Sequence, residues 1–127
     1  MAHFHIDYSA NLESVIDISG LCEAIRNCAA GMDCFPTAGV RVRALRVDYV
    51  SIADGNPNHG FIDLSVRLRA GRSPDVKKAA IAEIFETLKS YTAGAMDTHS
   101  IAISAEMRDI DAELAPKFGN IRDHMEG

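Results

Sequence analysis

Residues 60–75 read Gly60-Phe61-Ile62-Asp63-Leu64-Ser65-Val66-Arg67-Leu68-Arg69-Ala70-Gly71-Arg72-Ser73-Pro74-Asp75 and hold the clearest change of pattern in the chain. From Ile62 to Leu68 every second residue is apolar, which is typical of a β-strand with one buried face. A helix start follows, with Ser73 as N-cap, Pro74 at the first helical position and Asp75 near the positive end of the dipole. The stretch therefore predicts a strand that turns directly into a helix.

The predicted helix continues to about residue 95, because apolar residues recur every three or four positions from Ile81 to Tyr91. A further period-two pattern at Ile101, Ile103, Ala105 and Met107 predicts a last strand. Residues 60–110 thus form a β-α-β unit.

An earlier unit of the same kind precedes it, over about residues 2–52. Residues 3–8 alternate as a strand, residues 18–32 carry a helical stripe that stops near Gly31, and residues 40–50 are again rich in β-formers. The turn cluster 53–60 separates the two units. We expect residues 1–127 to form a single domain of two similar halves with a C-terminal extension.

Two right-handed crossovers would place both helices on the same face of one sheet, giving a two-layer α+β sandwich. The opposite face would then lack a helical layer. We expect that face to be partly apolar, as at Phe61, and to be covered by further copies of the chain in a homo-oligomer.

Composition argues against several classes of partner, site and location for this protein. The 127 residues carry 13 Lys and Arg against 18 Asp and Glu, a net charge of −5 that disfavours nucleic acid as a partner. Three cysteines without a C-x-x-C pair argue against a disulfide framework or a thiolate zinc site, which favours a cytoplasmic location. No apolar run approaches the roughly 20 residues of a membrane helix.

Several short motifs carry a family resemblance over roughly residues 2–122. They are His3-Phe4, Phe35-Pro36-x-Ala38-Gly39-x-Arg41-x-Arg43, Val47-Asp48, Ala53-Asp54-Gly55, Ala70-Gly71-Arg72-Ser73 and Asn120-Ile121. Together they resemble the 5-carboxymethyl-2-hydroxymuconate isomerase family of the tautomerase superfamily. The resemblance implies a β-α-β-β-α-β fold like that of macrophage migration inhibitory factor, assembled as a homotrimer.

The resemblance also implies chemistry: a cofactor-free 1,3-proton shift on a small carboxylated dienol in the breakdown of homoprotocatechuate and 4-hydroxyphenylacetate. The family's base is an N-terminal proline exposed by removal of Met, and here that position is Ala2. An α-amine has a reference pKa of about 7.7 to 8.0, so Ala2 can serve as a base if Met1 is removed.

Arg41 and Arg72 match the family's carboxylate-binding arginines, and Arg43 is a weaker third candidate. Guanidinium groups suit carboxylates because they bind them bidentately and stay charged. His3 and His5 share one side of a strand, but they lack a third ligand at metal spacing, so no metal site is predicted.

Two alternatives remain open. In the first, the chain is a tautomerase-fold trimer that has lost or altered its catalysis and binds a carboxylated metabolite; the absence of the N-terminal proline favours this alternative. In the second, the chain is an enzyme whose primary amine forms a Schiff base with a carbonyl substrate.

Overall fold

One four-stranded sheet organises the chain, whose computed structural model describes residues 1–126. The strands are β1 (Ala2–Ser9), β2 (Val40–Val47), β3 (His59–Arg69) and β4 (Ser100–Ile110). They lie in the order β2-β1-β3-β4, with β1 and β2 parallel, β1 and β3 antiparallel, and β3 and β4 parallel. The two predicted β-α-β units therefore meet along β1 and β3 at the centre of the sheet.

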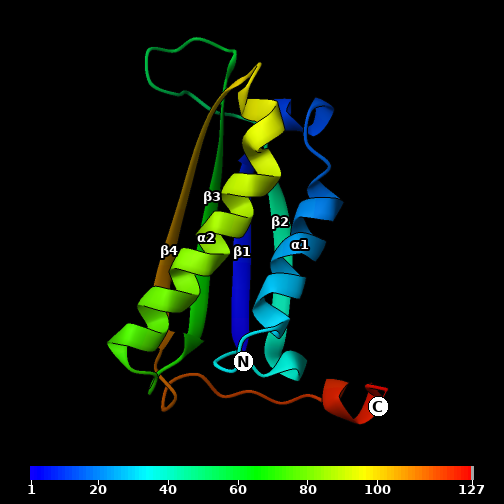
Figure 1. Cartoon of the computed structure of the whole chain (residues 1–127), viewed down its shortest axis with the longest axis vertical. Coiled ribbons are helices and arrows are strands. Elements are labelled where there is room, and N and C mark those ends of the chain that lie inside the picture. Colours follow the sequence, from blue (N-terminus) through cyan, green and yellow to red (C-terminus); the bar gives the residue numbers. More distant parts are fainter. Residues whose placement is uncertain (127) are drawn as a thin grey trace.

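Two helices, α1 (Ile18–Ala30) and α2 (Pro74–Met96), pack side by side on the same face of the sheet (Figure 1). The predicted start of α2 is confirmed, because the Ser73 hydroxyl accepts a hydrogen bond from the Val76 backbone N–H at 3.3 Å. Gly31 ends α1 as expected. The two-layer α+β sandwich inferred from the periodicities is the observed fold.

The core lies between the helices and the two central strands. Alternate residues of β1 and β3, from Phe4 to Tyr8 and from Ile62 to Leu68, are buried against this helical layer. Phe35, in the loop after α1, packs edge-on against Phe4 with their ring centroids 5.2 Å apart. This contact anchors the α1–β2 connection beside the start of β1.

The opposite face of the sheet carries both polar and apolar side chains. Part of it is charged, because His3 on β1 stands between Arg41 on β2 and Arg67 on β3. Leu45 on β2 is 51% exposed on this face, and Phe61 on β3 is half-buried there. The face is therefore partly apolar, as expected, and neither α1 nor α2 covers it (Figure 1).

Smaller differences concern element ends. Strand β2 stops at Val47, before the predicted residue 50, whereas β4 reaches Ile110, where the second unit was predicted to end. Near the end of β4, Asp109 pairs with Lys77 at 3.3 Å. Met96 is 42% exposed because it occupies the last turn of α2.

After β4 the chain runs along the end of the sheet where β1 begins, and it closes with the 3₁₀ turn η3 (Ile121–His124) (Figure 1). We call residues 111–126 the tail. Four of its apolar side chains are exposed: Leu114, Phe118, Ile121 and Met125. Among residues 1–126, no helix has the length and hydropathy that crossing a bilayer requires.

Candidate functional site

The amino terminus sits at the end of a central strand. Ala2 is buried and lies in register with Val40 on one side and Leu68 on the other, so the strand holds the first residues in place. Most chain termini fray because nothing ties them down, but this one is fixed by two neighbouring strands. A terminal amine at this point can therefore be aimed at a ligand.

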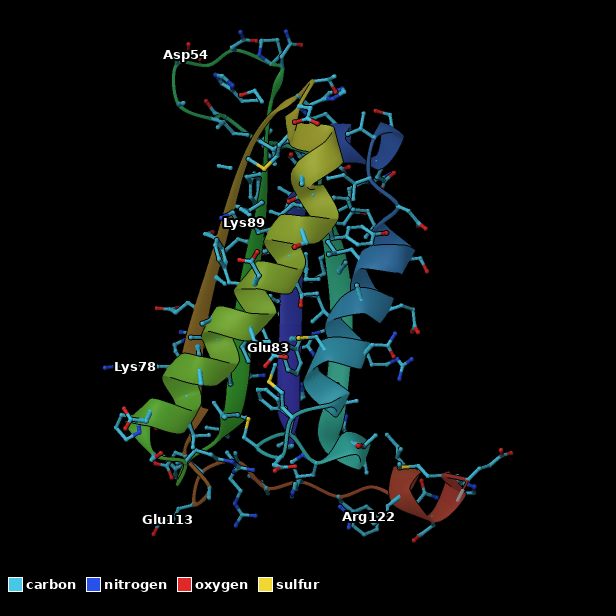
Figure 2. The ribbon with its side chains drawn as sticks, viewed as in Figure 1. Asp54, Lys78, Glu83, Lys89, Glu113 and Arg122 are labelled. Atoms are coloured by element: carbon cyan, nitrogen blue, oxygen red, sulfur yellow. The ribbon has the colours of Figure 1, made fainter. Side chains whose placement is uncertain are left out.

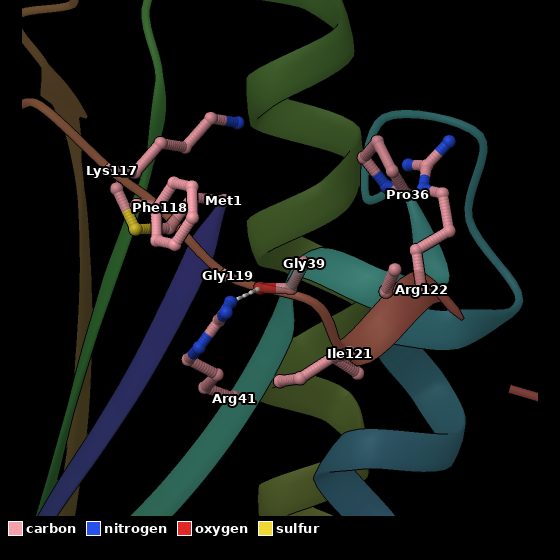
Figure 3. Close-up of a pocket in the computed structure, with 10 residues that line it drawn as sticks. Met1, Pro36, Gly39, Arg41, Lys117, Phe118, Gly119, Ile121 and Arg122 are labelled. Carbon is pink, nitrogen blue, oxygen red and sulfur yellow. Dashed lines mark hydrogen bonds between the residues drawn. The ribbon is translucent and has the colours of Figure 1, made fainter. Parts of the chain in front are cut away.

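A cavity of about 380 Å³ opens beside this terminus (Figure 3). It is lined by Met1, Pro36, Ala38, Gly39, Arg41, Lys117, Phe118, Gly119, Ile121 and Arg122. Among the lining residues that the structure describes, three are cations and none carries a carboxylate. A site with this charge attracts anionic ligands although the chain as a whole is negative.

Gly39 lets β2 approach the terminus closely. A Cβ placed on Gly39 would lie 3.1 Å from both the nitrogen and the Cα of Met1, which is tighter than nearly all Cβ contacts. The carbonyl oxygen of Gly39 accepts a hydrogen bond from Arg41 Nη1 at 3.0 Å (Figure 3). Glycine thus makes room for the terminus and helps to orient a guanidinium of the cavity.

The surroundings of the terminal amine favour its neutral form. The pKa of the Met1 amine is lowered from its ordinary value of 8.0, first by burial and then by the positive charges of Lys117, Arg72 and Arg41. Burial and nearby cations both disfavour the protonated form. These effects act on the amine of Met1, one residue before the Ala2 amine that the sequence analysis considered.

Arg72 lies close to the amine, but its hydrogen bonds serve the backbone. Its guanidinium donates to the carbonyl oxygens of Cys34 at 2.9 Å and Arg69 at 3.1 Å, and it is absent from the cavity lining. It therefore ties the loop after α1 to the turn between β3 and α2. Its positive charge still acts on the amine.

Arg43 lies two residues after Arg41 on β2 and faces the side of the sheet that carries no helices. Arg43 Nη1 donates to His3 Nδ1 at 3.0 Å. Burial and the charges of Arg43, Arg67 and Arg41 lower the pKa of His3, which favours the neutral ring whose unprotonated nitrogen can accept this bond. The structure thus brings Arg41 to the cavity wall, places Arg72 nearby, and leaves Arg43 outside the lining.

Sequence reasoning missed the contribution of the tail. Lys117, Phe118 and Arg122 line the cavity, although only Asn120-Ile121 in this region was singled out as familiar. The available signal was the pair of basic residues, Lys117 and Arg122, following the acidic run that ends at Glu113. Without the path of the tail, that signal does not reveal which part of the fold the two cations face.

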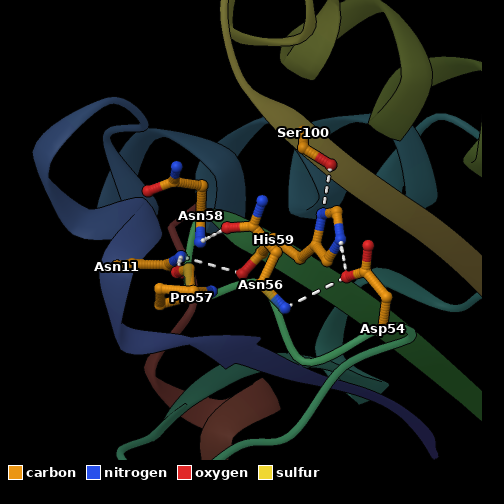
Figure 4. Close-up of polar contacts among 7 residues, drawn as sticks. All are labelled: Asn11, Asp54, Asn56, Pro57, Asn58, His59 and Ser100. Atoms are coloured by element: carbon orange, nitrogen blue, oxygen red, sulfur yellow. Dashed lines mark hydrogen bonds and ion pairs between the residues drawn. The ribbon is translucent and has the colours of Figure 1, made fainter.

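A second polar cluster lies at the opposite end of the sheet (Figure 4). His59 Nε2 bonds Asp54 Oδ1 at 2.8 Å and His59 Nδ1 bonds Ser100 Oγ at 2.7 Å. The Asn11 amide donates to the His59 carbonyl oxygen at 2.9 Å. These bonds connect the 53–58 loop to the starts of β3 and β4, and we interpret the cluster as a loop fastening.

Comparisons with known proteins agree with this architecture. The family model described as 5-carboxymethyl-2-hydroxymuconate isomerase matches residues 2–125. The 5-carboxymethyl-2-hydroxymuconate Delta-isomerase of Escherichia coli is 30% identical over 121 residues, covering 95% of this chain and 96% of the relative. A crystal structure of a 5-carboxymethyl-2-hydroxymuconate delta-isomerase superposes with a TM-score of 0.90 at 26% identity, covering 100% of this chain and 95% of the other.

A more distant structure, a fused 4-OT solved as a symmetric trimer, shares the fold at 19% identity with a TM-score of 0.57, covering 86% of this chain and 85% of that one. The family match spans nearly the whole chain, including the tail that completes the cavity. By this match and by its fold, the chain belongs to the 5-carboxymethyl-2-hydroxymuconate isomerase family of the tautomerase superfamily.

Proposed function

We propose that this protein is a 5-carboxymethyl-2-hydroxymuconate delta-isomerase that moves a proton along a carboxylated dienol in homoprotocatechuate and 4-hydroxyphenylacetate catabolism. One observation carries the proposal: Met1 lines a cavity whose described lining residues include three cations and no carboxylate, and burial together with nearby cations lowers the pKa of the terminal amine at the place where an anionic substrate would bind. Family membership supports the reaction type.

The chemistry follows from the charges. A neutral amine takes a proton from one end of a three-atom enol unit and returns it to the carbon at the other end, so the net change is an isomerisation. Negative charge accumulates on the dienolate oxygen between these two steps. The guanidinium and ammonium groups of the cavity stabilise that charge without reorganising, because they already surround the amine.

Each candidate residue receives a role in this proposal. The amine of Ala2, once Met1 is removed, is the catalytic base. Arg41 binds a substrate carboxylate at the cavity wall. Arg72 contributes positive charge and holds the loop that carries Pro36, and Arg43 acts at longer range from the open sheet face.

We further propose that the functional unit is a cytoplasmic homotrimer. The tail supports this assembly, since Phe118 is fully exposed and Leu114 is 81% exposed in the single chain. Aromatic side chains that are exposed on one chain are common anchors at subunit interfaces.

The test is a ketonisation assay on protein whose Met1 status has been determined by intact mass. Protein lacking Met1 should convert a 2-hydroxymuconate-type dienol, and acylating the terminal amine in the absence of substrate, which removes its basicity, should reduce the rate. If the processed protein binds the carboxylated dienol without converting it, the chain is instead a tautomerase-fold binding protein that has lost its catalysis.

A further inference from the structure

The bonds that fasten the 53–58 loop also place a carboxylate and a hydroxyl on the two ring nitrogens of His59 (Figure 4). His59 Nε2 lies 2.8 Å from Asp54 Oδ1, and His59 Nδ1 lies 2.7 Å from Ser100 Oγ. Among the histidines of residues 1–126, only His59 bonds a carboxylate on one nitrogen and a hydroxyl on the other. A hydroxyl, an imidazole and a carboxylate in this sequence are the parts of an activated serine nucleophile.

The direction of the two bonds follows from the chemistry of the partners. An ionised carboxylate can only accept, so the proton of the neutral ring stands on Nε2 and is donated to Asp54. Nδ1 then accepts the hydroxyl proton of Ser100. The Asn56 backbone N–H also donates to Asp54 Oδ1, at 3.0 Å, and this bond is the first cause of the lowered pKa of Asp54. Asp54 therefore favours the tautomer in which His59 can take a proton from Ser100.

Paired strands carry the two reacting groups. His59 begins β3 and Ser100 begins β4, and the two residues are partners in the parallel register. Asp54 reaches the ring from the preceding loop, between Ala53 and Gly55, whose φ angles are 52° and 88°. A positive φ is uncommon for alanine, and it precedes the residue whose carboxylate turns back toward the strand (Figure 4). Groups held on strands keep their geometry better than groups on loops.

The hydroxyl is open to solvent. Ser100 is exposed, and the side chains of Asp54 and His59 are 75% and 23% exposed. The cluster lies at the end of the molecule opposite the amino-terminal cavity, as the positions of Asp54 and of Arg122, which lines that cavity, show (Figure 2). None of the three residues of the cluster lines that cavity. A substrate can therefore reach Ser100 without entering the isomerase site.

We propose that Ser100, His59 and Asp54 form a second catalytic site, which transfers acyl groups from small activated esters. His59 Nδ1 takes the hydroxyl proton while Ser100 Oγ bonds to the carbonyl carbon of the ester. The bond from that carbon to the alcohol oxygen then breaks, and the imidazolium gives its proton to the departing alcohol. Water repeats these steps on the acyl-serine: it gives a proton to His59, its oxygen bonds to the carbonyl carbon, and the acid leaves as Ser100 regains its proton.

The exposure of the cluster sets the class of substrate. An open site does not enclose the oxyanion that forms during acyl transfer, so amides, which have poor leaving groups, are not expected to react. An ester of a short carboxylic acid with an acidic alcohol needs mainly a nucleophile and a base, and the cluster supplies both. Ser100 and His59 are the catalytic residues, and Asp54 is a positioning residue that acts through His59. The site is independent of the isomerase reaction, so the two proposals can fail separately.

Hydrolysis of p-nitrophenyl acetate tests the site. General base catalysis typically contributes about 100- to 10,000-fold, and other nucleophiles of the chain supply a background rate, so Ser100→Ala should slow nitrophenolate release about tenfold or more. Peptide mapping of acid-quenched wild-type protein should find an acetyl group on Ser100. Ser104→Ala is the matched control, because Ser104 lies on the same strand and donates to the Asp63 carboxylate at 2.8 Å without an imidazole between them. This variant should keep the wild-type rate.

Asp54→Asn separates the charge of Asp54 from its place in the loop. An asparagine oxygen can still accept the bond from the Asn56 N–H, so the turn should persist. The new amide can donate to His59 Nε2 and so favour the tautomer with the proton on Nδ1, which cannot take the Ser100 proton. The rate should fall about tenfold or more, and the ¹⁵N NMR shifts of the ring nitrogens should report the change of tautomer.

The Ser100→Ala variant decides the outcome, because loss of one exposed hydroxyl should leave the fold intact, which circular dichroism would check. If the folded variant hydrolyses the ester at the wild-type rate, the cluster only fastens the loop and the inference is overturned.

Discussion

Arg72→Ala should reduce the stability of the fold more than it reduces ligand affinity. Arg72 donates hydrogen bonds to Cys34 O at 2.9 Å and Arg69 O at 3.1 Å, joining two loops that are distant in the sequence. A hydrogen bond to a charged group contributes about 1.5 to 3 kcal/mol when buried. Arg72 is only partly buried and the carbonyls it leaves can be hydrated, so we expect a total loss of about 1 to 2 kcal/mol.

That loss corresponds to a decrease in Tm of roughly 4 to 8 °C for a chain of this length. Urea titrations and thermal melts at one fixed protein concentration would measure it, because subunit association makes Tm concentration-dependent. Arg26→Ala is the matched control, since Arg26 is exposed on α1 and its partners among residues 1–126 are its helical neighbours Glu23 and Asn27, so the Tm of this variant should barely change.

Arg72→Lys separates the two roles of this side chain. Lysine keeps the positive charge but has no planar fork to reach both carbonyls, so stability should fall while electrostatic attraction for a carboxylate persists. The reasoning is refuted if Arg72→Ala unfolds at the wild-type urea concentration and yet loses dicarboxylate affinity by tenfold or more. Arg72 would then be a direct ligand of the substrate rather than a connection between loops.

Further predictions concern the amine, the tail and the core. The value of kcat/KM should rise with pH as the amine loses its proton. Lys117→Met should move this rise to higher pH, because the substitution removes a cation that lowers the pKa of the amine. A pH profile that does not move would contradict this prediction. Ala2→Pro, with Met1 absent by mass, should raise ketonisation at least roughly tenfold by restoring a rigid secondary amine, and an unchanged rate would show that the pocket has diverged elsewhere. Phe118→Ser should weaken trimer formation in sedimentation velocity, whereas a wild-type trimer would exclude the tail from the interface. Phe35→Ala should lower the urea-derived stability by about 3 to 5 kcal/mol, because the ring is fully buried against Phe4, and a loss below 1 kcal/mol would be inconsistent with that packing.

The sequence alone determined the elements and their order. The alternation from Ile62 to Leu68 and the cap at Ser73 and Pro74 act within a few residues, so the strand and the helix start could be predicted from local pattern. The right-handed crossover rule then placed both helices on one face. The motif that contains Gly39 and Arg41 marked Arg41 as a candidate carboxylate ligand, and both residues line the cavity.

Only the tertiary structure decided which groups meet. Arg72 donates a hydrogen bond to the carbonyl oxygen of Cys34, 38 positions away in the sequence. The tail brings Lys117 close to the terminal amine, at the other end of the chain. The charged part of the open sheet face depends on strand register, which sets His3 between Arg41 and Arg67. Local periodicity specifies an element, but side-chain partners depend on how distant elements pack, and that is fixed only when the whole chain folds.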